Sequence, residues 1–377
     1  MGKGRGLNME TVRSSNIGAV LSYLNTYGAS SRKKIAEDLK LTTATLTILT
    51  SDLIKEGLLV ELGEVTENKV GRKKILIDIN EKSRFCLGLE IQKRKIIFII
   101  TDLKANIIFE KEWSREKSFD IEEFNKILDF IENEIKEIKE KILGMGILVQ
   151  GEIENKIAIS SPIPNILEIV EKRLEIKCLL ENNMKGLVLS EMHFKENHRN
   201  FWVLKYGPGV GTSVVLDGKI LQGTENKPIE FGHAPLFRKN SNNYCSICKK
   251  SGCVESEVHF DHVVKKFIDL GYEKNEEETD FDFVNRVSKK SGMEILNNVL
   301  DILSDYIILA SWIVPVDELI LSGRFFSEER FFKAFKNKLK NKPSNIKQEN
   351  ISCMKDYSYK RKIAGAILIL EDFFNNY

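Results

Sequence analysis

The order of apolar patterns in the first 80 residues restricts the fold more than any other feature of the sequence. Residues 9–27 place apolar side chains on one side of a helix, and Gly28 can end that helix. Ser30 or Ser31 can then cap a short second helix at 32–39, because a hydroxyl accepts a free amide of the first helical turn. Two helices with a short connection are therefore expected at the start of the chain.

A third helix and two strands complete this segment. Thr42 can cap the third helix, which Gly57 ends, and strands are expected at 58–65 and 73–80 with a polar, basic turn between them. Three helices followed by a hairpin are typical of a winged helix-turn-helix, whose third helix enters the major groove of DNA. Residues 1–80 are therefore predicted to bind DNA; a helical adaptor that binds a protein is the alternative.

The candidate DNA contacts lie near the starts of two helices and in the turn of the hairpin. Hydroxyls there can bond phosphates or bases, and methyl groups suit thymine. The third helix has no Arg or Lys in its first three turns, which favours an A·T-rich site over guanine reading. Residues 1–80 carry 12 Lys or Arg against 9 Asp or Glu, a mild excess that permits nucleic-acid binding. The predicted contacts are Ser31, Arg32, Thr42, Thr43, Ala44, Thr47, Ile48, Arg72 and Lys73.

The pattern after the hairpin combines strands with helices. Three short apolar runs begin at Phe85, and a helix at 121–141 and a strand at 142–149 follow them. A second strand-rich segment begins at Phe201. Helical runs, a strand and a last helix follow it, at 254–270, 280–313, 318–323 and 358–374. This order predicts an α/β fold with two lobes of the actin and sugar-kinase type, a ribonuclease H-like ATPase fold. Its expected limits are 81–377 overall, 81–180 plus 358–374 for lobe one, and 181–357 for lobe two.

Three of the six cysteines lie within one short stretch, CSICKKSGC at 245–253. The chain has no run of about 18 apolar residues and no apolar signal segment after Met1, so we expect a cytoplasmic protein without a membrane segment. Clustered cysteines in that compartment are more often metal ligands or reactive thiols than disulfides. Cys245, Cys248 and Cys253 can supply three ligands to a tetrahedral zinc ion, and His233 can supply the fourth. A thiol switch and inert cysteines are the alternatives. The other cysteines stand singly in apolar segments and are expected in the core: Cys86, Cys178 and Cys353.

Two further groups of residues have more than one interpretation. The segment 207–212, GPGVGT, joins two strand-like runs, so it is either a tight hairpin turn or a loop that offers backbone amides to a phosphate. Asn182, Asn183, Glu230 and Glu255 lie at the edges of apolar segments. Amides and carboxylates of this kind hold sugar hydroxyls, although such residues more often lie on the surface.

Taken together, these motifs resemble the ROK family, which contains transcriptional repressors and sugar kinases. The segments RSSNIGAVLSYL, SSRKKIAEDLKLTTATLTILTSDLIKEGLL and GRKK are similar to the helix-turn-helix and wing of the xylose-repressor-like branch. The segments GMGILVQG, ENN, GPGVGTSVVLDGKILQG, EFGH, CKKSGCVE and AGA follow in the family's order. The likeness covers nearly the whole chain.

The resemblance implies two adjoining sites in the second part of the chain. The first is a structural zinc (Zn²⁺) site formed by His233, Cys245, Cys248 and Cys253. The second is a sugar pocket formed by Asn182, Asn183, Glu230, His233 and Glu255. His233 could serve both, with one ring nitrogen on the metal and the other toward the ligand. The family usually separates its first two cysteines by one residue, whereas two residues separate Cys245 from Cys248.

Three departures from the family's kinases argue against catalysis. Asn183 stands where the kinases have the aspartate that takes a proton from the sugar, and an amide cannot accept that proton at neutral pH. The segment 90–93, EIQK, replaces the glycine turn of the first phosphate loop, and the last strand ends with Ser322-Gly323 where two glycines are usual. No enzymatic activity is therefore expected.

These observations predict a DNA-binding transcriptional repressor of carbohydrate-utilisation genes. A sugar or sugar derivative bound in the inactive ROK domain would modulate its affinity for double-stranded operator DNA, and the protein would work as a homodimer or homotetramer. Two alternatives remain open. One is a regulator gated by a protein partner without sugar binding, and the other is an active ROK sugar kinase with a DNA-binding appendage.

Overall fold

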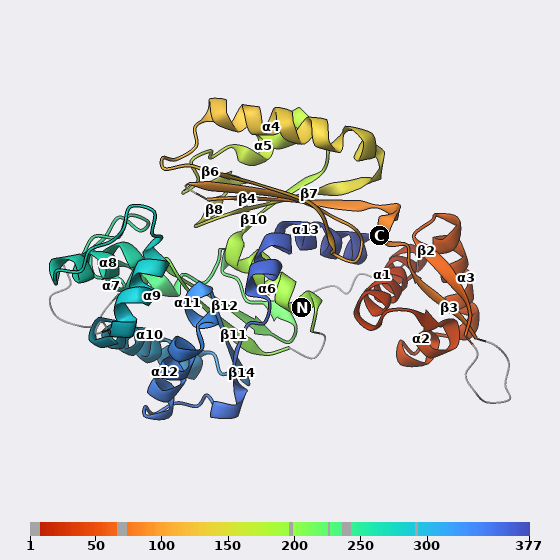
Figure 1. Cartoon of the computed structure of the whole chain (residues 1–377). Helices are drawn as coiled ribbons and strands as arrows, with labels where there is room; N and C mark the ends of the chain where they lie inside the picture. Colours follow the sequence, from red (N-terminus) through yellow and green to blue (C-terminus); the bar gives the residue numbers. More distant parts are fainter. Residues whose placement is uncertain are drawn as a thin grey trace. The chain divides into compact units, whose positions relative to one another are not determined.

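The computed structural model describes residues 8–65, 74–92, 94–195, 199–224, 227–235, 243–290 and 293–377. The chain forms two compact units, Met1–Glu196 with Arg361–Tyr377, and Asn197–Lys360 (Figure 1). Within the described ranges, every helix is too short or too polar to span a membrane. The predicted division at residue 80 and between two lobes stays a prediction.

The first unit begins with three helices and a small antiparallel sheet. The helices are α1 (Met9–Tyr27), α2 (Arg32–Asp38) and α3 (Thr43–Lys55), and the sheet has the order β1 (Ser30–Ser31), β3 (Lys74–Ile79), β2 (Leu59–Val65). The predicted caps are confirmed: the Ser31 hydroxyl accepts the amide of Lys34 at 3.3 Å, and the Thr42 hydroxyl accepts that of Thr45 at 3.1 Å. The predicted winged helix-turn-helix arrangement is therefore present in the described residues. Strand β1 is too short to be recognised from the sequence.

A five-stranded mixed sheet forms the centre of the first unit. Its order is β10 (Cys178–Asn182), β7 (Ile142–Val149), β4 (Phe85–Ile91), β5 (Lys95–Thr101), β6 (Ile107–Ser114). The strands β4, β5 and β6 are antiparallel neighbours, as expected, whereas β7 and β10 run parallel to β4. A two-stranded hairpin, β8 (Ile153–Glu154) with β9 (Ile157–Ala158), follows β7.

Helices cover both faces of this sheet. Figure 1 shows α4 (Ile121–Ile135) and α5 (Ile166–Leu174) on one face, and α6 (Asn183–His193) and α13 (Tyr357–Asn376) on the other. The α-helix α4 is shorter than predicted because 136–141 forms a 3₁₀ segment, Lys136–Lys141. Helix α13 contacts β7 through backbone atoms, since a Cβ on Gly146 would lie 1.9 Å from the carbonyl oxygen of Gly365. The AGA motif therefore gives α13 a close approach that a larger residue would block.

The second unit repeats the same kind of sheet. Its order is β13 (Lys219–Ile220), β12 (Val210–Leu216), β11 (Phe201–Tyr206), β14 (Glu318–Ser322), β15 (Ile351–Cys353). The first three are antiparallel neighbours, and β14 and β15 run parallel to β11. Two five-stranded mixed sheets with helices confirm the predicted two-lobed α/β class.

The helices of the second unit pack on an aromatic core. They are α7 (Val254–Val258), α8 (Phe260–Asp269), α9 (Asp280–Lys290), α10 (Met293–Ile313), α11 (Arg324–Ser327) and α12 (Glu329–Lys340). The run predicted at 254–270 is broken at His259, whose backbone is extended and whose Nδ1 accepts the amide of Asp261 at 3.2 Å. Tyr206, Phe260 and Phe325 are fully buried and meet edge to face. Strand β15 and helix α11 were not predicted, because short elements carry weak periodicity. Helix α12 was also not predicted, although its buried residues Phe331, Phe335 and Leu339 recur at helical spacing.

Candidate functional site

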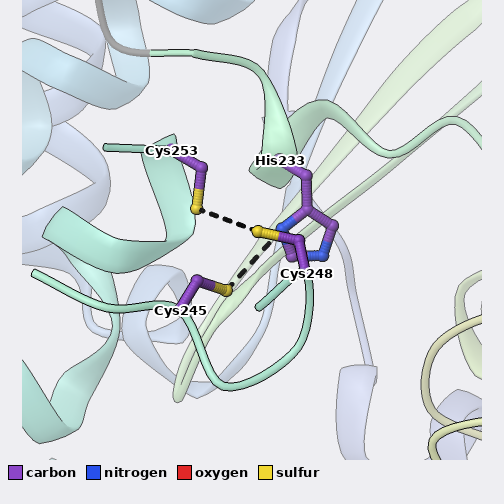
Figure 2. A group of neighbouring side chains, drawn as sticks. All are labelled: His233, Cys245, Cys248 and Cys253. Carbon is purple, nitrogen blue, oxygen red and sulfur yellow. Dashed lines mark hydrogen bonds between the residues drawn. The ribbon is translucent and has the colours of Figure 1, made fainter. Parts of the chain in front are cut away.

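Four predicted metal ligands come together in the second unit. The donor atoms of His233, Cys245, Cys248 and Cys253 all lie within 4.8 Å of one another. Figure 2 shows these side chains converging, with 3.9 Å between the sulfurs of Cys248 and Cys253 and 3.9 Å between Cys245 Sγ and His233 Nδ1. Donors about 2.3 Å from a tetrahedral ion lie roughly 3.8 Å from one another. The donor set and its spacing therefore fit a tetrahedral metal such as zinc.

Local hydrogen bonds explain how the sequence brings these ligands together. The amide of Cys245 donates to the carbonyl of Lys250 at 2.9 Å, which closes the turn that carries the first two thiols. Cys253 caps α7 and pairs with Pro235 in an isolated bridge, and the amide of Val254 donates to the carbonyl of Ala234 at 3.1 Å. Cys253 is thereby tied to the segment that directly follows His233.

The thiol of Cys253 is protonated when no cation is present. The pKa of Cys253 is raised to about 12, mainly by burial and also by the neighbouring thiol of Cys245, while the amide of Ser256 acts to lower it. A thiolate is the form that binds a metal, so metal binding must release this proton. Burial also raises the pKa of Cys178 to about 12, and burial raises that of Cys86 further still. Both lie in the core as predicted; Cys353 is only partly buried.

His233 faces the thiols with one ring nitrogen and a carboxylate with the other. Its Nε2 atom lies 3.7 Å from Oε2 of Glu230, which directly precedes the 3₁₀ turn Phe231–His233. The side chain of Glu230 is 46% exposed, whereas that of His233 is 20% exposed. An ion bound at Nδ1 would fix the tautomer of the ring and leave Nε2 with a proton to donate.

Glu255 holds the glycine-rich turn between β11 and β12. Its Oε2 atom accepts the amide of Val210 at 2.8 Å, and a Cβ on Gly209 would lie 2.1 Å from its Oε1 atom. Tyr206 pairs with Val210 in the antiparallel register, so the tight-hairpin interpretation of 207–212 is confirmed. A carboxylate that already binds one of the turn's amides opposes an incoming phosphate through its charge.

The two asparagines predicted for the sugar pocket lie in the first unit and differ in their availability. Asn182 caps α6: its Oδ1 accepts the amide of Met184 at 2.8 Å, and its Nδ2 donates to the carbonyl of Gly151 at 2.8 Å. Its side chain is thus committed to bonds within the unit. Asn183 is half-buried, and its side chain makes no hydrogen bond within the described ranges. Of this pair, Asn183 is the one with unused donors and acceptors for a ligand.

An ion pair between the buried Glu90 and the half-buried Arg361 occupies the end of β4, the segment predicted to lack a phosphate loop. Glu90 is 5% exposed, and its carboxylate receives bonds from Arg361 at 3.0 and 3.1 Å and from Gln92 at 2.7 Å. Arg361 belongs to α13 and is 271 residues away in the sequence. This pair was not predicted, because the sequence pattern around Glu90 contains no information about a partner 271 residues away.

Eight of the nine predicted DNA contacts fall into three groups in the structure. Four are exposed on the first turns of α3: Thr43, Ala44, Thr47 and Ile48. Ser31 and Thr42 are caps whose hydroxyls already accept backbone amides. Arg72 and Lys73 lie outside the described residues. The exposed group on α3 therefore carries most of the candidate surface.

Arg32 has internal partners within the helix-turn-helix. Its Nε donates to the Thr50 hydroxyl at 2.8 Å, and its Nη2 lies 2.8 Å from Oε1 of Glu61. The guanidinium thereby links the start of α2 to α3 and β2. Its contacts are those of a residue that holds these three elements together.

Comparisons with known proteins agree with this geometry. The sequence model of the ROK family matches residues 86–372. The chain is 29% identical to the xylose repressor of Caldicellulosiruptor bescii over 259 residues, 64% of this chain and 64% of that protein. It is 22% identical to the N-acetylglucosamine repressor of Escherichia coli O157:H7 over 262 residues, 66% of this chain and 63% of that protein. The match thus spans a little under two thirds of the length of both relatives. A crystal structure of a ROK family transcriptional regulator, a homologue of the E. coli MLC protein, shares the fold with a TM-score of 0.77 at 17% identity, covering 97% of this chain and 98% of the other.

Proposed function

Because the chain belongs to the ROK family, we propose that it is a DNA-binding transcriptional repressor of carbohydrate-utilisation genes. Its similarity to a xylose repressor and an N-acetylglucosamine repressor supports this proposal. The main structural observation behind it is the exposed face of α3. Thr43, Ala44, Thr47 and Ile48 offer hydroxyl and methyl groups on the helix that enters the major groove in a winged helix-turn-helix. As a DNA-binding protein it would act in the cytoplasm.

The proposed ligand of the ROK domain is a sugar or sugar derivative. Asn183 would contribute its amide, and Glu230, His233 and Glu255 would accept or donate bonds to hydroxyl groups. A zinc ion held by His233, Cys245, Cys248 and Cys253 would cross-link the cysteine turn to the segment that carries Glu230. The ion's part would be structural, since all four of its positions would be taken by protein ligands.

Three positions that would serve phosphoryl transfer to a sugar are replaced or already engaged in this chain. Asn183 cannot serve as a base, Glu90 is neutralised by Arg361, and Glu255 occupies an amide of the glycine turn. We therefore propose that the ROK domain binds a ligand and does not phosphorylate it.

Regulation follows from thermodynamic linkage. A sugar can weaken operator binding only by as much as it prefers the DNA-incompetent state of the protein over the competent one. In a homodimer or homotetramer, two winged helices would read half-sites about one helical turn apart, roughly 34 Å. A ligand that changes the separation of the two α3 helices would spoil this match and release the operator.

Replacing Ile48 with glutamate tests the DNA-binding surface. Ile48 is 62% exposed, so the change should leave folding intact, while the new carboxylate repels phosphates and removes an apolar base contact. We expect operator affinity to fall about tenfold or more. The measurement is fluorescence anisotropy with a duplex selected by the wild-type protein from a random-sequence library.

Ile121→Glu is the matched control. Ile121 is 46% exposed at the start of α4, in the same unit, and the substitution brings the same change in charge. Its operator affinity should equal that of the wild type. If Ile48→Glu and the wild type bind the operator with equal affinity, this face of α3 does not contact DNA.

A further inference from the structure

Helix α6 connects a candidate ligand residue to the DNA-binding segment. It begins at Asn183 and ends at His193, and its 11 residues span about 16 Å. Leu148 of β7 packs against Gly186 of this helix, where a Cβ would lie 2.8 Å from the leucine methyl groups. An α-helix held this closely moves as a rigid body, so its two ends move together.

His193 at the end of α6 is buried and bonded to two other helices. Its side chain is 2% exposed. Its Nδ1 atom lies 2.7 Å from Oε1 of Glu371 on α13, and its Nε2 atom lies 2.8 Å from Nδ2 of Asn25 on α1. A carboxylate accepts and an amide nitrogen donates, so a neutral ring with its hydrogen on Nδ1 satisfies both bonds. The three side chains thus form one chain of hydrogen bonds from α13 through α6 to α1.

Among the described residues, α1 also meets the end of α13 through a hydrogen bond and a close backbone approach. The Ser14 hydroxyl donates to the carbonyl oxygen of Tyr377 at 2.5 Å. A Cβ on Gly18 would lie 2.0 Å from the carbonyl oxygen of Phe374, so the two backbones approach closely there. Beside them lies a cavity of about 660 Å³, lined mainly by polar residues, among them Thr11, Ser15 and Ser22. Ser14 and Tyr377 line this cavity, so water can replace their bond at low cost, whereas His193 is buried and its bond to Asn25 holds α1 more firmly.

We infer that His193 is the positioning residue through which α6 reports ligand contact at Asn183 to the DNA-binding helices. This inference rests on the proposed function and identifies the residues that would couple its two sites. A shift of α6 by about 1 Å lengthens the bond to Asn25 beyond hydrogen-bonding range. Helix α1 then loses one of its bonds to the ROK domain, and α3, whose Asp52 pairs with Arg13 of α1 at 2.8 Å, shifts with α1. The ligand state at one end of α6 is thereby coupled to operator affinity at the other.

Two substitutions at His193 separate its two bonds. His193→Asn places an amide donor near the position of Nδ1, so it keeps the bond to Glu371 and loses the bond to Asn25. His193→Gln places an amide oxygen near the position of Nε2, so it keeps an acceptor for Asn25. Asn25→Ala removes the same bond from the α1 side, and Thr26→Ala is its control, because the Thr26 hydroxyl bonds only within α1, to the carbonyl of Ser22.

The measurement is the ratio of operator dissociation constants with and without a saturating sugar, with D-xylose and N-acetyl-D-glucosamine as probes. His193→Asn and Asn25→Ala should lower this ratio at least fivefold, while His193→Gln and Thr26→Ala should keep it within twofold of the wild type. Calorimetric affinity for the sugar in the absence of DNA should stay within threefold in all four variants, which a general loss of structure would not allow.

Three outcomes decide the matter. The expected pattern of ratios supports the inference. Equal ratios in all variants, with a clear sugar effect in the wild type, overturn the inference and leave the proposed function standing. A wild type that binds operator with the same affinity in every sugar overturns the sugar-responsive part of the proposed function, and the inference with it.

Discussion

Replacing Cys253 with serine should remove the bound metal and destabilise the second unit by more than about 3 kcal/mol. A serine hydroxyl is a poor zinc ligand, and the three remaining donors leave the ion with an open position. Cys253 also caps α7, which carries Glu255, so the loss should loosen the ligand residues. Metal content by mass spectrometry should fall from one zinc per chain to below 0.2 in the variant, an expectation of roughly fivefold loss for a site missing one of four ligands.

Cys353→Ser is the matched control for this experiment. Cys353 lies in the same unit, and its thiol donates to the carbonyl of Phe326 at 3.2 Å, a bond that a hydroxyl can also make. The control should keep its zinc. Cys245→Ser should behave like Cys253→Ser although its spacing departs from the family's usual pattern, because its sulfur lies 3.9 Å from the ring of His233. Full zinc in either ligand variant, or none in the wild type, would contradict the proposed site.

The second large effect is expected from Gly146→Ala. The new methyl group would lie 1.9 Å from the carbonyl oxygen of Gly365; the methyl carbon is fixed to the backbone of a strand, and the oxygen belongs to the backbone of a helix. Neither can turn away as a side chain could, so α13 must lift from the sheet. We expect a loss of about 3 kcal/mol in the free energy of unfolding of the first unit, the upper end of what overpacking costs.

Urea unfolding followed by circular dichroism measures this loss. Gly223→Ala is the control, since its Cβ would have ordinary contacts of 3.6 Å with Lys227. The control should change the unfolding free energy by less than about 1 kcal/mol. A Gly146→Ala protein as stable as the control would show that α13 does not rest on β7 as closely as the structure has it.

Local signals in the sequence were sufficient for the DNA-binding segment and the metal cluster. The caps Ser31 and Thr42 act over three residues, and a hydroxyl followed by an apolar pattern marks a helix start without knowledge of the fold. The ligands Cys245, Cys248 and Cys253 lie on one turn, so their spacing alone indicated chelation. His233 is twelve residues from Cys245 in the sequence, and it was still predicted as the fourth ligand.

Contacts between segments that are distant in the sequence could not be predicted from it. Arg361 and Glu90 form an ion pair that the pattern of neither segment predicts. His193 has no local pattern that marks it, and its bonds to Asn25 and Glu371 depend on three helices meeting in the folded unit. Arg32 was predicted to contact DNA from its charge and place, but charge does not reveal that Glu61 lies within 2.8 Å. Such pairings are set by tertiary packing.

The central claim is that a sugar controls the affinity of this protein for operator DNA. The direct measurement is an anisotropy titration of the zinc-loaded wild-type protein against its selected duplex, alone and with saturating pentoses, hexoses, amino sugars and their phosphates. We predict a dissociation constant of roughly 10⁻⁸ M without sugar and at least a tenfold increase, about 1.4 kcal/mol, with one member of the panel. No saturable binding to any duplex, or one unchanged dissociation constant across the whole panel, would contradict the claim.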